Sequence, residues 1–184
     1  MRRLVGRFDV TLFASMRFEH LIEINDPGLP HVQPFSREQL WTGLMLRVSE
    51  PQQFPLGPDR IDCEPSGDEA GQVKRTLHFG GIQVTDTVHA RAGEAVVFVP
   101  DPHGDSTPVK LTITIEEPAA SALILRFVYE SMEPPSEEES FYDGFRQSAW
   151  LENDRDMVRT LRQWLAEGRL GGADGTAASG CAAE

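Results

Sequence analysis

Short segments of the chain alternate apolar and polar residues, which is the pattern of half-buried β-strands. The segment 18–25 reads FEHLIEIN, and the segment 109–117 reads VKLTITIEE. Further strand-like segments are bounded by turn-forming residues. They are residues 60–64, 72–79, 82–91, 95–99 and 122–132. This spacing predicts an antiparallel sheet of six to seven strands.

Two other segments place apolar residues at helical spacing, and each begins with a capping box. Ser36 and Gln39 open the first helix, which Pro51 ends. Ser136 and Glu139 open the second, a helix of roughly 25 to 30 residues. Its apolar stripe consists of Phe141, Phe145, Trp150, Met157, Val158, Leu161 and Leu165. A helix this long needs an apolar surface to lie on, so we expect it to pack on the sheet.

The order strand, short helix, six strands, long helix predicts an α+β fold, with a curved antiparallel sheet wrapped around the long C-terminal helix and an apolar pocket between them. One domain is expected at residues 16–170. Residues 1–15 are expected to be a leader or an upstream-start extension outside it, because Met16 directly precedes the first strand. Residues 171–184 are rich in Gly and Ala and predict a disordered tail.

The dipeptide Gly80-Gly81 lies between two strand-like segments and predicts a two-residue hairpin turn, because glycine tolerates positive φ angles. In that register Arg75 faces Asp86, on the same inward face as the pair Leu77 and Val84. The two charges form either a solvated ion pair near the sheet edge or a polar anchor inside an apolar cavity. The pattern leaves both interpretations open.

A second hairpin, formed by the last two strands, brings Tyr129 to the same inward face. The residues predicted to line the cavity are Trp41, Phe54, Arg75, Leu77, Phe79, Val84, Asp86, Ile113, Ile115, Phe127, Tyr129 and Phe145. Arg75, Asp86 and Tyr129 are the polar members of this set. A pocket that is mostly apolar with a few convergent polar groups is typical of small-molecule binding.

The formal net charge of −12 is expected to repel phosphate backbones, so nucleic acid is not an expected partner. No apolar run approaches the roughly 18 residues that a membrane-spanning helix needs, so no stable membrane insertion is expected. The histidines lack metal-ligand spacing, and no nucleophile or phosphate-loop motif occurs, so catalytic residues are unknown and no metal or cofactor is expected. Cys63 and Cys181 are not expected to form a disulfide, because Cys181 lies in the small-residue tail, and this usage favours a cytoplasmic location.

Several segments resemble one branch of a known superfamily. They are residues 16–26, 37–41, 112–118 and 125–130, which read MRFEHLIEIND, REQLW, TITIEEP and LRFVYE. With Arg75 and Asp86 in the central hairpin, they are similar to the AtaL-like branch of the SRPBCC superfamily, the START and birch-pollen-allergen-like helix-grip proteins. The resemblance covers about residues 16–169. It implies the helix-grip fold, and the branch itself has no assigned activity.

Proteins of this superfamily carry lipids or hormones, cyclise polyketides or act in ring hydroxylation, so the fold alone does not assign a function. The resemblance implies a cavity for a small hydrophobic ligand. The first hypothesis is a binding protein in which Arg75, Asp86 and Tyr129 orient that ligand. The alternative is a cyclase or isomerase of polyketide-type metabolism, with Tyr129 or Asp86 as acid or base. A third is an interaction protein with an incompletely filled core, and a homodimer is left open.

Overall fold

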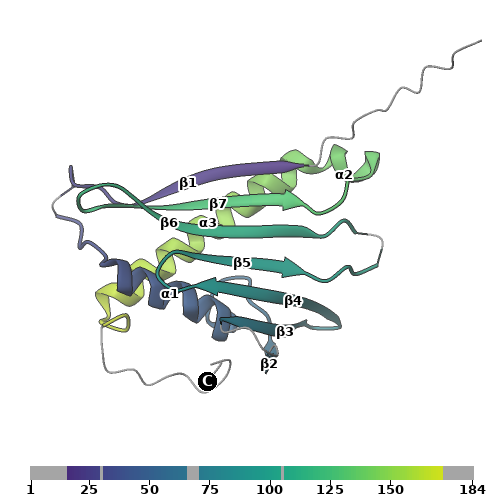
Figure 1. The fold of residues 1–184 in the computed structure, drawn as a ribbon, viewed down its shortest axis with the longest axis horizontal. Coiled ribbons are helices and arrows are strands. Elements are labelled where there is room, and N and C mark those ends of the chain that lie inside the picture. Colours follow the sequence, from purple (N-terminus) through teal and green to yellow (C-terminus); the bar gives the residue numbers. More distant parts are fainter. Residues whose placement is uncertain (1–15, 30, 66–70, 105, 172–184) are drawn as a thin grey trace, which may run out of the picture.

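The computed structural model describes residues 16–29, 31–65, 71–104 and 106–171. The leader expected at residues 1–15 lies outside these ranges, and so does the expected tail from residue 172 onward. The described chain forms one curved sheet with the long helix running across it (Figure 1).

Neighbouring strands of the sheet all run antiparallel, and their order is β1-β7-β6-β5-β4-β3-β2. Their bounds are β1 Arg17–Asn25, β2 Arg60–Pro65, β3 Gln72–Phe79, β4 Ile82–Arg91, β5 Ala95–Pro100, β6 Val109–Ala119 and β7 Ala122–Ser131. The first strand therefore lies beside the last, while β2 to β7 follow one another in chain order. The prediction of a six- to seven-stranded antiparallel sheet is confirmed.

The turn at Gly80-Gly81 gives β3 and β4 the predicted register. Gly80 has a φ of +57°, which a residue with a Cβ adopts only with strain. Across the two strands, Arg75 pairs with Asp86 and Leu77 pairs with Val84. Arg75 and Asp86 therefore share a face of the sheet with the apolar pair Leu77 and Val84.

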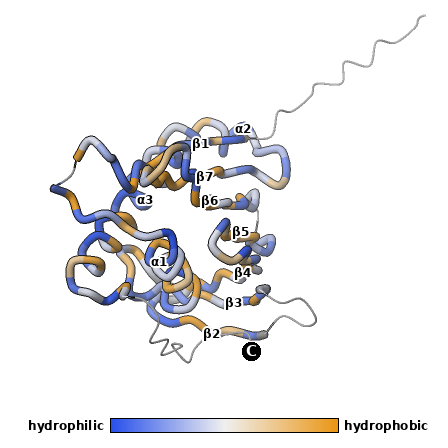
Figure 2. The backbone as a smooth tube through the Cα atoms, turned by 60° about the vertical axis from the view of Figure 1, so that its left-hand side comes forward, coloured by the Kyte–Doolittle hydropathy of each residue, from blue (hydrophilic) through white to orange (hydrophobic). Residues whose placement is uncertain are grey.

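The helices α1 and α3 lie on the same side of the sheet (Figure 2). The helical elements are α1 Arg37–Ser49, the 3-10 turn η1 Pro51–Gln53, α2 Glu137–Phe141 and α3 Asp143–Ala166. The predicted capping box of α1 is present, because the Ser36 hydroxyl accepts from the Gln39 N–H at 3.1 Å and the Gln39 side chain accepts from the Ser36 N–H at 2.9 Å. The α+β fold, with its long C-terminal helix, is confirmed.

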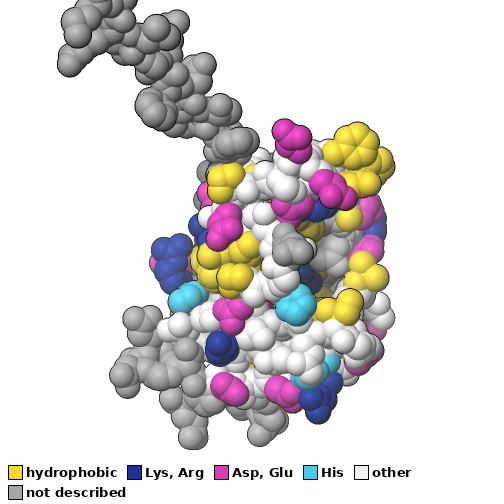
Figure 3. Space-filling view, turned by 90° about the vertical axis from the view of Figure 1, so that its right-hand side faces the viewer, with side chains coloured by type: hydrophobic (Ala, Val, Ile, Leu, Met, Phe, Trp, Pro, Cys, Tyr) yellow, Lys and Arg dark blue, Asp and Glu magenta, His cyan; other side chains and the backbone are white. Residues whose placement is uncertain are grey.

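The second capping box is also present, but it caps the five-residue helix α2 instead of the long helix. The prediction of one continuous helix is wrong, because the helical path breaks at Tyr142, where φ is −92° and ψ is 1°. Phe141 and Phe145, which the helical pattern places in the buried stripe, are 75% and 72% exposed. Phe141 belongs to α2 and Phe145 to the first turn of α3, and this end of the helical path lies by the end of β7 (Figure 1). On the face seen in Figure 3, several hydrophobic side chains are exposed among acidic ones.

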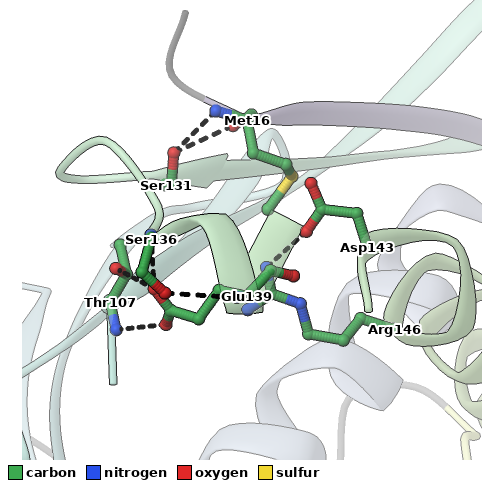
Figure 4. Close-up of polar contacts among 7 residues, drawn as sticks. All are labelled: Met16, Thr107, Ser131, Ser136, Glu139, Asp143 and Arg146. Carbon is green, nitrogen blue, oxygen red and sulfur yellow. Dashed lines mark hydrogen bonds and ion pairs between the residues drawn. The ribbon is translucent and has the colours of Figure 1, made fainter. Parts of the chain in front are cut away.

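Hydrogen bonds to the Glu139 side chain connect α2 to the segment before β6 (Figure 4). Its carboxylate accepts hydrogen bonds from the Ser136 N–H at 2.9 Å, the Thr107 N–H at 2.8 Å and the Thr107 hydroxyl at 2.9 Å. These bonds, the one from Ser136 first, lower the pKa of Glu139 from 4.5 to about 2, because they favour the charged form. A carboxylate at the surface thus fixes the position of α2.

The core lies between the sheet and the two longer helices. Its fully buried side chains include Val88, Val96, Ile113, Leu125 and Phe127 from the sheet, and Leu40, Leu44, Met157 and Leu161 from the helices. Burial of one such side chain stabilises the fold by about 1.5–3 kcal/mol. At Gly43, helices α1 and α3 approach so closely that a Cβ would lie 2.6 Å from Cδ2 of Leu161. Glycine at this position therefore sets the spacing between the two helices.

Cys63 of β2 is disulfide-bonded, so the prediction that the cysteines form no disulfide is wrong for this residue. Cys181 lies outside the described residues. The small-residue composition of the segment that contains Cys181 does not determine where its side chains lie. It was therefore no evidence against a disulfide. Disulfides persist mainly in oxidising compartments, and the cytoplasmic location stays a prediction. Among the described residues, no helix is both long and apolar enough to cross a membrane.

Candidate ligand-binding cavity

A cavity of about 220 Å³ lies between the end of α1, the segment after η1, strands β3 to β6 and helix α3. It is lined by Arg47, Pro51, Phe54, Pro55, Leu56, Gly57, Pro58, Arg75, Leu77, Phe79, Asp86, Phe98, Leu111 and Asn153. Most of these side chains are apolar, and four can form hydrogen bonds. Leu56 and Phe79 are also exposed to solvent, so they mark the side on which the cavity opens. The arrangement suits a small molecule with an apolar body and a few polar atoms.

Five of the twelve residues predicted from the sequence line this cavity: Phe54, Arg75, Leu77, Phe79 and Asp86. The other seven do not. Four of them are buried in the core: Ile113, Ile115, Phe127 and Tyr129. Trp41 is partly buried and packs against the core. Val84 and Phe145 belong neither to the core nor to the lining of the cavity. Strand alternation places a side chain on the correct face, but the helices decide which part of that face stays uncovered.

Sequence reasoning missed four lining residues that matter for the chemistry: Arg47, Phe98, Leu111 and Asn153. The strand pattern could have identified Leu111, because this residue belongs to the alternating set of side chains that point inward from its strand. The two polar residues, Arg47 and Asn153, lie on different helices, and no local pattern indicates which helical side chains face a cavity.

Arg75 and Asp86 form a buried ion pair, with exposed fractions of 3% and 6%. The Arg75 Nε donates to Asp86 Oδ1 at 2.8 Å, and its Nη2 contacts Asp86 Oδ2. Its Nη1 donates to the carbonyl of Val48 at 2.9 Å, near the C-terminus of α1. A cation is favourable at that end of a helix. The interpretation as a solvated edge pair is therefore wrong, since the pair is buried and joins the sheet to α1 while lining the cavity.

Arg47 brings a second positive charge to the cavity wall. Burial lowers the pKa of its guanidinium, because desolvation disfavours the charged form, and the charge of Asp154 acts in the opposite direction. Its guanidinium lies 5.9 Å from the centre of the Phe54 ring. Within the described part of the chain, no side chain forms a hydrogen bond or an ion pair with it. Arg47 therefore places a positive charge at the wall of an apolar cavity, with N–H donors that have no side-chain acceptor in the described residues.

Tyr129 belongs to a separate polar cluster with Asp154 of α3 and His20 of β1. The Tyr129 hydroxyl donates to Asp154 Oδ2 at 2.8 Å, and His20 Nε2 lies 3.2 Å from the same oxygen. Burial raises the pKa of Tyr129, and the charge of Asp154 adds to that shift. The Tyr129 ring stacks on Trp150 with centroids 4.4 Å apart, and His20 stacks on Phe127 at 4.9 Å. The cluster therefore lies in an aromatic surrounding between helix and sheet.

A second recess of about 290 Å³ lies where the loop after β1 meets α3. Its basic residue, Arg162, donates to the Gln33 carbonyl at 2.7 Å and also contacts the Ile24 carbonyl. Because backbone carbonyls already accept from both terminal nitrogens of Arg162, this recess offers a ligand fewer free donors than the first cavity does. Within the described residues, no group of three or more His, Cys, Asp or Glu side chains could hold a metal ion.

The seven-stranded antiparallel sheet with the long C-terminal helix across it is the helix-grip fold. The sequence profile of one family, described as acetylaranotin biosynthesis cluster protein L (AtaL), matches residues 22–168. The chain therefore belongs to the AtaL family, which confirms the resemblance seen in the sequence. No curated protein sequence matches the chain significantly.

Solved structures with the same fold share little sequence with this chain. The di-domain aromatase/cyclase StfQ of the steffimycin biosynthetic pathway is 13% identical, with a TM-score of 0.60, over 87% of this chain and 53% of its own. The Zhui aromatase/cyclase from Streptomyces sp. R1128 is 11% identical, with a TM-score of 0.57, over 89% of this chain and 100% of its own. Ara h 8.0201 is 12% identical, with a TM-score of 0.54, over 84% and 99%. The chain thus spans about half the length of the di-domain protein, and these likenesses concern the fold alone.

Proposed function

We propose that the protein binds a small hydrophobic molecule in the cavity beside β3 and α3, and that an oxygen atom of this ligand accepts a hydrogen bond from Arg47. The observation that carries the proposal is the Arg47 guanidinium, which is half-buried at the wall of an apolar cavity and has no side-chain hydrogen bond in the described residues. Such a donor gains a hydrogen bond to a charged group when a ligand oxygen accepts from it. An apolar molecule with a carbonyl, carboxylate or sulfonate group satisfies that need.

The residues that line the cavity suit an apolar ligand with an oxygen acceptor. Phe98, Leu77 and Leu111 supply apolar contact, while Asn153 adds an amide on the α3 side. Arg75 and Asp86 satisfy each other, so they shape the wall without requiring a ligand charge. The cavity of about 220 Å³ is smaller than the roughly 300–1,000 Å³ of common ligand pockets, which favours a compact ligand.

A matched pair of fluorescent probes tests the proposal. 1-Anilinonaphthalene-8-sulfonate and N-phenyl-1-naphthylamine differ by one sulfonate group, which can accept from Arg47. We expect both to bind saturably, and we expect Arg47→Met to weaken the sulfonate probe about tenfold to a hundredfold, the worth of a hydrogen bond to a charged group. The uncharged probe should keep its affinity, because methionine preserves the apolar length of the side chain.

Filling the cavity provides the control for location. Leu111→Trp places an indole in the cavity and should abolish binding of both probes, whereas Thr112→Trp, on the opposite face of β6, should not. Unchanged binding in Leu111→Trp would move the probes to another site and overturn the proposal.

A second candidate is a cyclase or isomerase of polyketide-type metabolism that uses the same cavity. The family description names a biosynthesis cluster, and two similar folds are titled aromatase/cyclases, which favours this candidate. Asp86 reaches the cavity, but both of its oxygens already contact Arg75. Tyr129, the other expected acid or base, is hydrogen-bonded to Asp154 outside the lining. Mass spectrometry of a linear polyketide mimic, incubated with wild type and with Leu111→Trp, tests for a cavity-dependent product.

A further inference from the structure

Asp154 is a completely buried carboxylate near the middle of α3, with an exposed fraction of 0%. Its Oδ2 accepts from the Tyr129 hydroxyl at 2.8 Å and lies 3.2 Å from His20 Nε2. Its Oδ1 has no hydrogen-bond partner among the described residues, and the same holds for both ring nitrogens of His20. The cluster therefore presents an unpaired acceptor in the interior of the protein.

A carboxylate oxygen in the protein interior that lacks a hydrogen-bond partner costs free energy. Most buried polar atoms in folded proteins have a hydrogen-bond partner, and an exception calls for an explanation such as a bound molecule. The charge of Arg47 acts on Asp154 only at long range, since no hydrogen bond joins the two side chains. No described residue supplies a donor to Asp154 Oδ1, which leaves this acceptor open to a bound molecule.

Three residues that line the cavity are also neighbours of the cluster or interact with it. Asn153, the residue before Asp154, lines the cavity, and so does Arg47, whose charge interacts with Asp154. Leu111 also lines it and pairs with Tyr129 across β6 and β7, so the two side chains are neighbours on one face. The polar cluster therefore lies directly behind the lining of the cavity.

We propose that Asp154 Oδ1 accepts a hydrogen bond from a hydroxyl group of the bound molecule. The inference rests on the proposed function and narrows the ligand to compact ring compounds that carry a hydroxyl donor as well as an acceptor for Arg47. The stacked pairs Tyr129–Trp150 and His20–Phe127, whose planes are 3° and 5° from parallel, surround the cluster with aromatic rings. A ligand ring suits such surroundings, because aromatic rings gain from offset stacking or edge contact.

The test compares 2-naphthol with 2-methylnaphthalene, which have nearly the same shape but differ in the hydroxyl donor. The ratio of their affinities is measured for the wild type and for Asp154→Asn. Asparagine keeps an oxygen for Tyr129 and replaces the free Oδ1 by a donor. We expect the preference for 2-naphthol to fall about tenfold or more in Asp154→Asn, since hydrogen bonds to charged groups contribute about 1.5–3 kcal/mol.

Asp156→Asn is the matched control, because Asp156 lies two residues further along α3, partly exposed and paired with Arg159. This variant should keep the wild-type ratio. If both probes bind and Asp154→Asn leaves the ratio unchanged, the inference is overturned while the proposed function stands, and a buried water is the partner of Oδ1. If neither probe binds the wild type, the proposed function fails and the inference falls with it.

A readout on the wild type does not depend on the folding of a variant. 2-Naphthol becomes a strong acid when it is excited. A carboxylate within hydrogen-bond distance can then accept its proton, so the emission comes from naphtholate. We expect naphtholate emission from the bound probe. Emission from neutral 2-naphthol alone would show that no carboxylate accepts its proton, and would overturn the inference.

Discussion

Asp86 and Asp154 are both buried carboxylates on the helix side of the sheet, but their oxygens are used differently. Asp86 faces Arg75 across a strand pair, and both of its oxygens contact that guanidinium. Asp154 reaches from a helix toward two strands, and one of its oxygens has no partner in the described chain. A complete set of partners indicates a structural role, whereas an incomplete set indicates that something else completes it.

The cause of the difference lies in how the partners are positioned. A hairpin with a two-residue turn holds opposed side chains about 5 Å apart, so one arginine can meet one carboxylate fully. The partners of Asp154 come from β1 and β7, and their positions also depend on how α3 packs on the sheet. Packing between a helix and a sheet fixes such partners less directly than a strand ladder does, and Asp154 Oδ1 is left without a partner in the described residues.

Removal of Asp86 should have the largest effect of the variants considered. Asp86→Ala leaves Arg75 as a buried charge without its carboxylate, so we expect the free energy of unfolding to fall by about 3–5 kcal/mol. Urea denaturation measures this change. Asp62→Ala, which removes an exposed partner of Arg60, is the control and should cost less than about 1 kcal/mol. Similar losses in both variants would contradict the structural role of Asp86.

Tyr129→Phe should have an intermediate effect. The change removes the hydroxyl that donates to Asp154 and keeps the ring that stacks on Trp150. We expect a loss of about 1–3 kcal/mol, the cost of leaving a buried acceptor without its donor. Thermal or urea unfolding measures it, and a loss as large as that of Asp86→Ala would mean that the two clusters are equally structural.

Asp154→Asn should be milder than either change, with a loss below about 1 kcal/mol. The amide oxygen still accepts from Tyr129, and the buried, half-paired charge disappears. The measurement is again the free energy of unfolding, now compared with the probe affinities. Stability nearly as in the wild type, combined with a changed probe preference, would separate recognition from folding at this residue.

Glu139→Gln should give the smallest effect, which appears as a change in pH dependence. The folded protein holds the pKa of Glu139 at about 2, below its ordinary value of 4.5. Its contribution to stability is therefore present above pH 4.5 and is lost as the pH falls toward 2. Unfolding curves between these limits should be flatter for Glu139→Gln than for the wild type. Parallel curves would mean that the bonds to Thr107 and Ser136 do not persist in solution.

The sequence predicted those parts of the molecule in which nearby residues determine the geometry. The turn at Gly80-Gly81 defines the register that places Arg75 opposite Asp86, and each capping box is contained in four residues. The break at Tyr142 and the exposure of Phe145 depend on where the sheet ends, which no local pattern contains.

The polar cluster around Asp154 was beyond sequence reasoning for a similar reason. His20 and Asp154 lie on the first strand and the last helix and meet only after the sheet has formed. A single acidic residue on a long, highly charged helix gives no sign that it points inward. Arg47 is comparable, because the last turn of α1 looks like any solvent-exposed helix end until α3 and β3 are in place.

The glycine at position 43 has a consequence for how this protein family can diversify. A larger side chain there would collide with Leu161 and push α3 away from α1. Since α3 carries Asn153, such a shift would also move one wall of the cavity. Exchange of this one small residue, which does not itself line the cavity, is therefore a route by which protein engineering can change the size of the cavity.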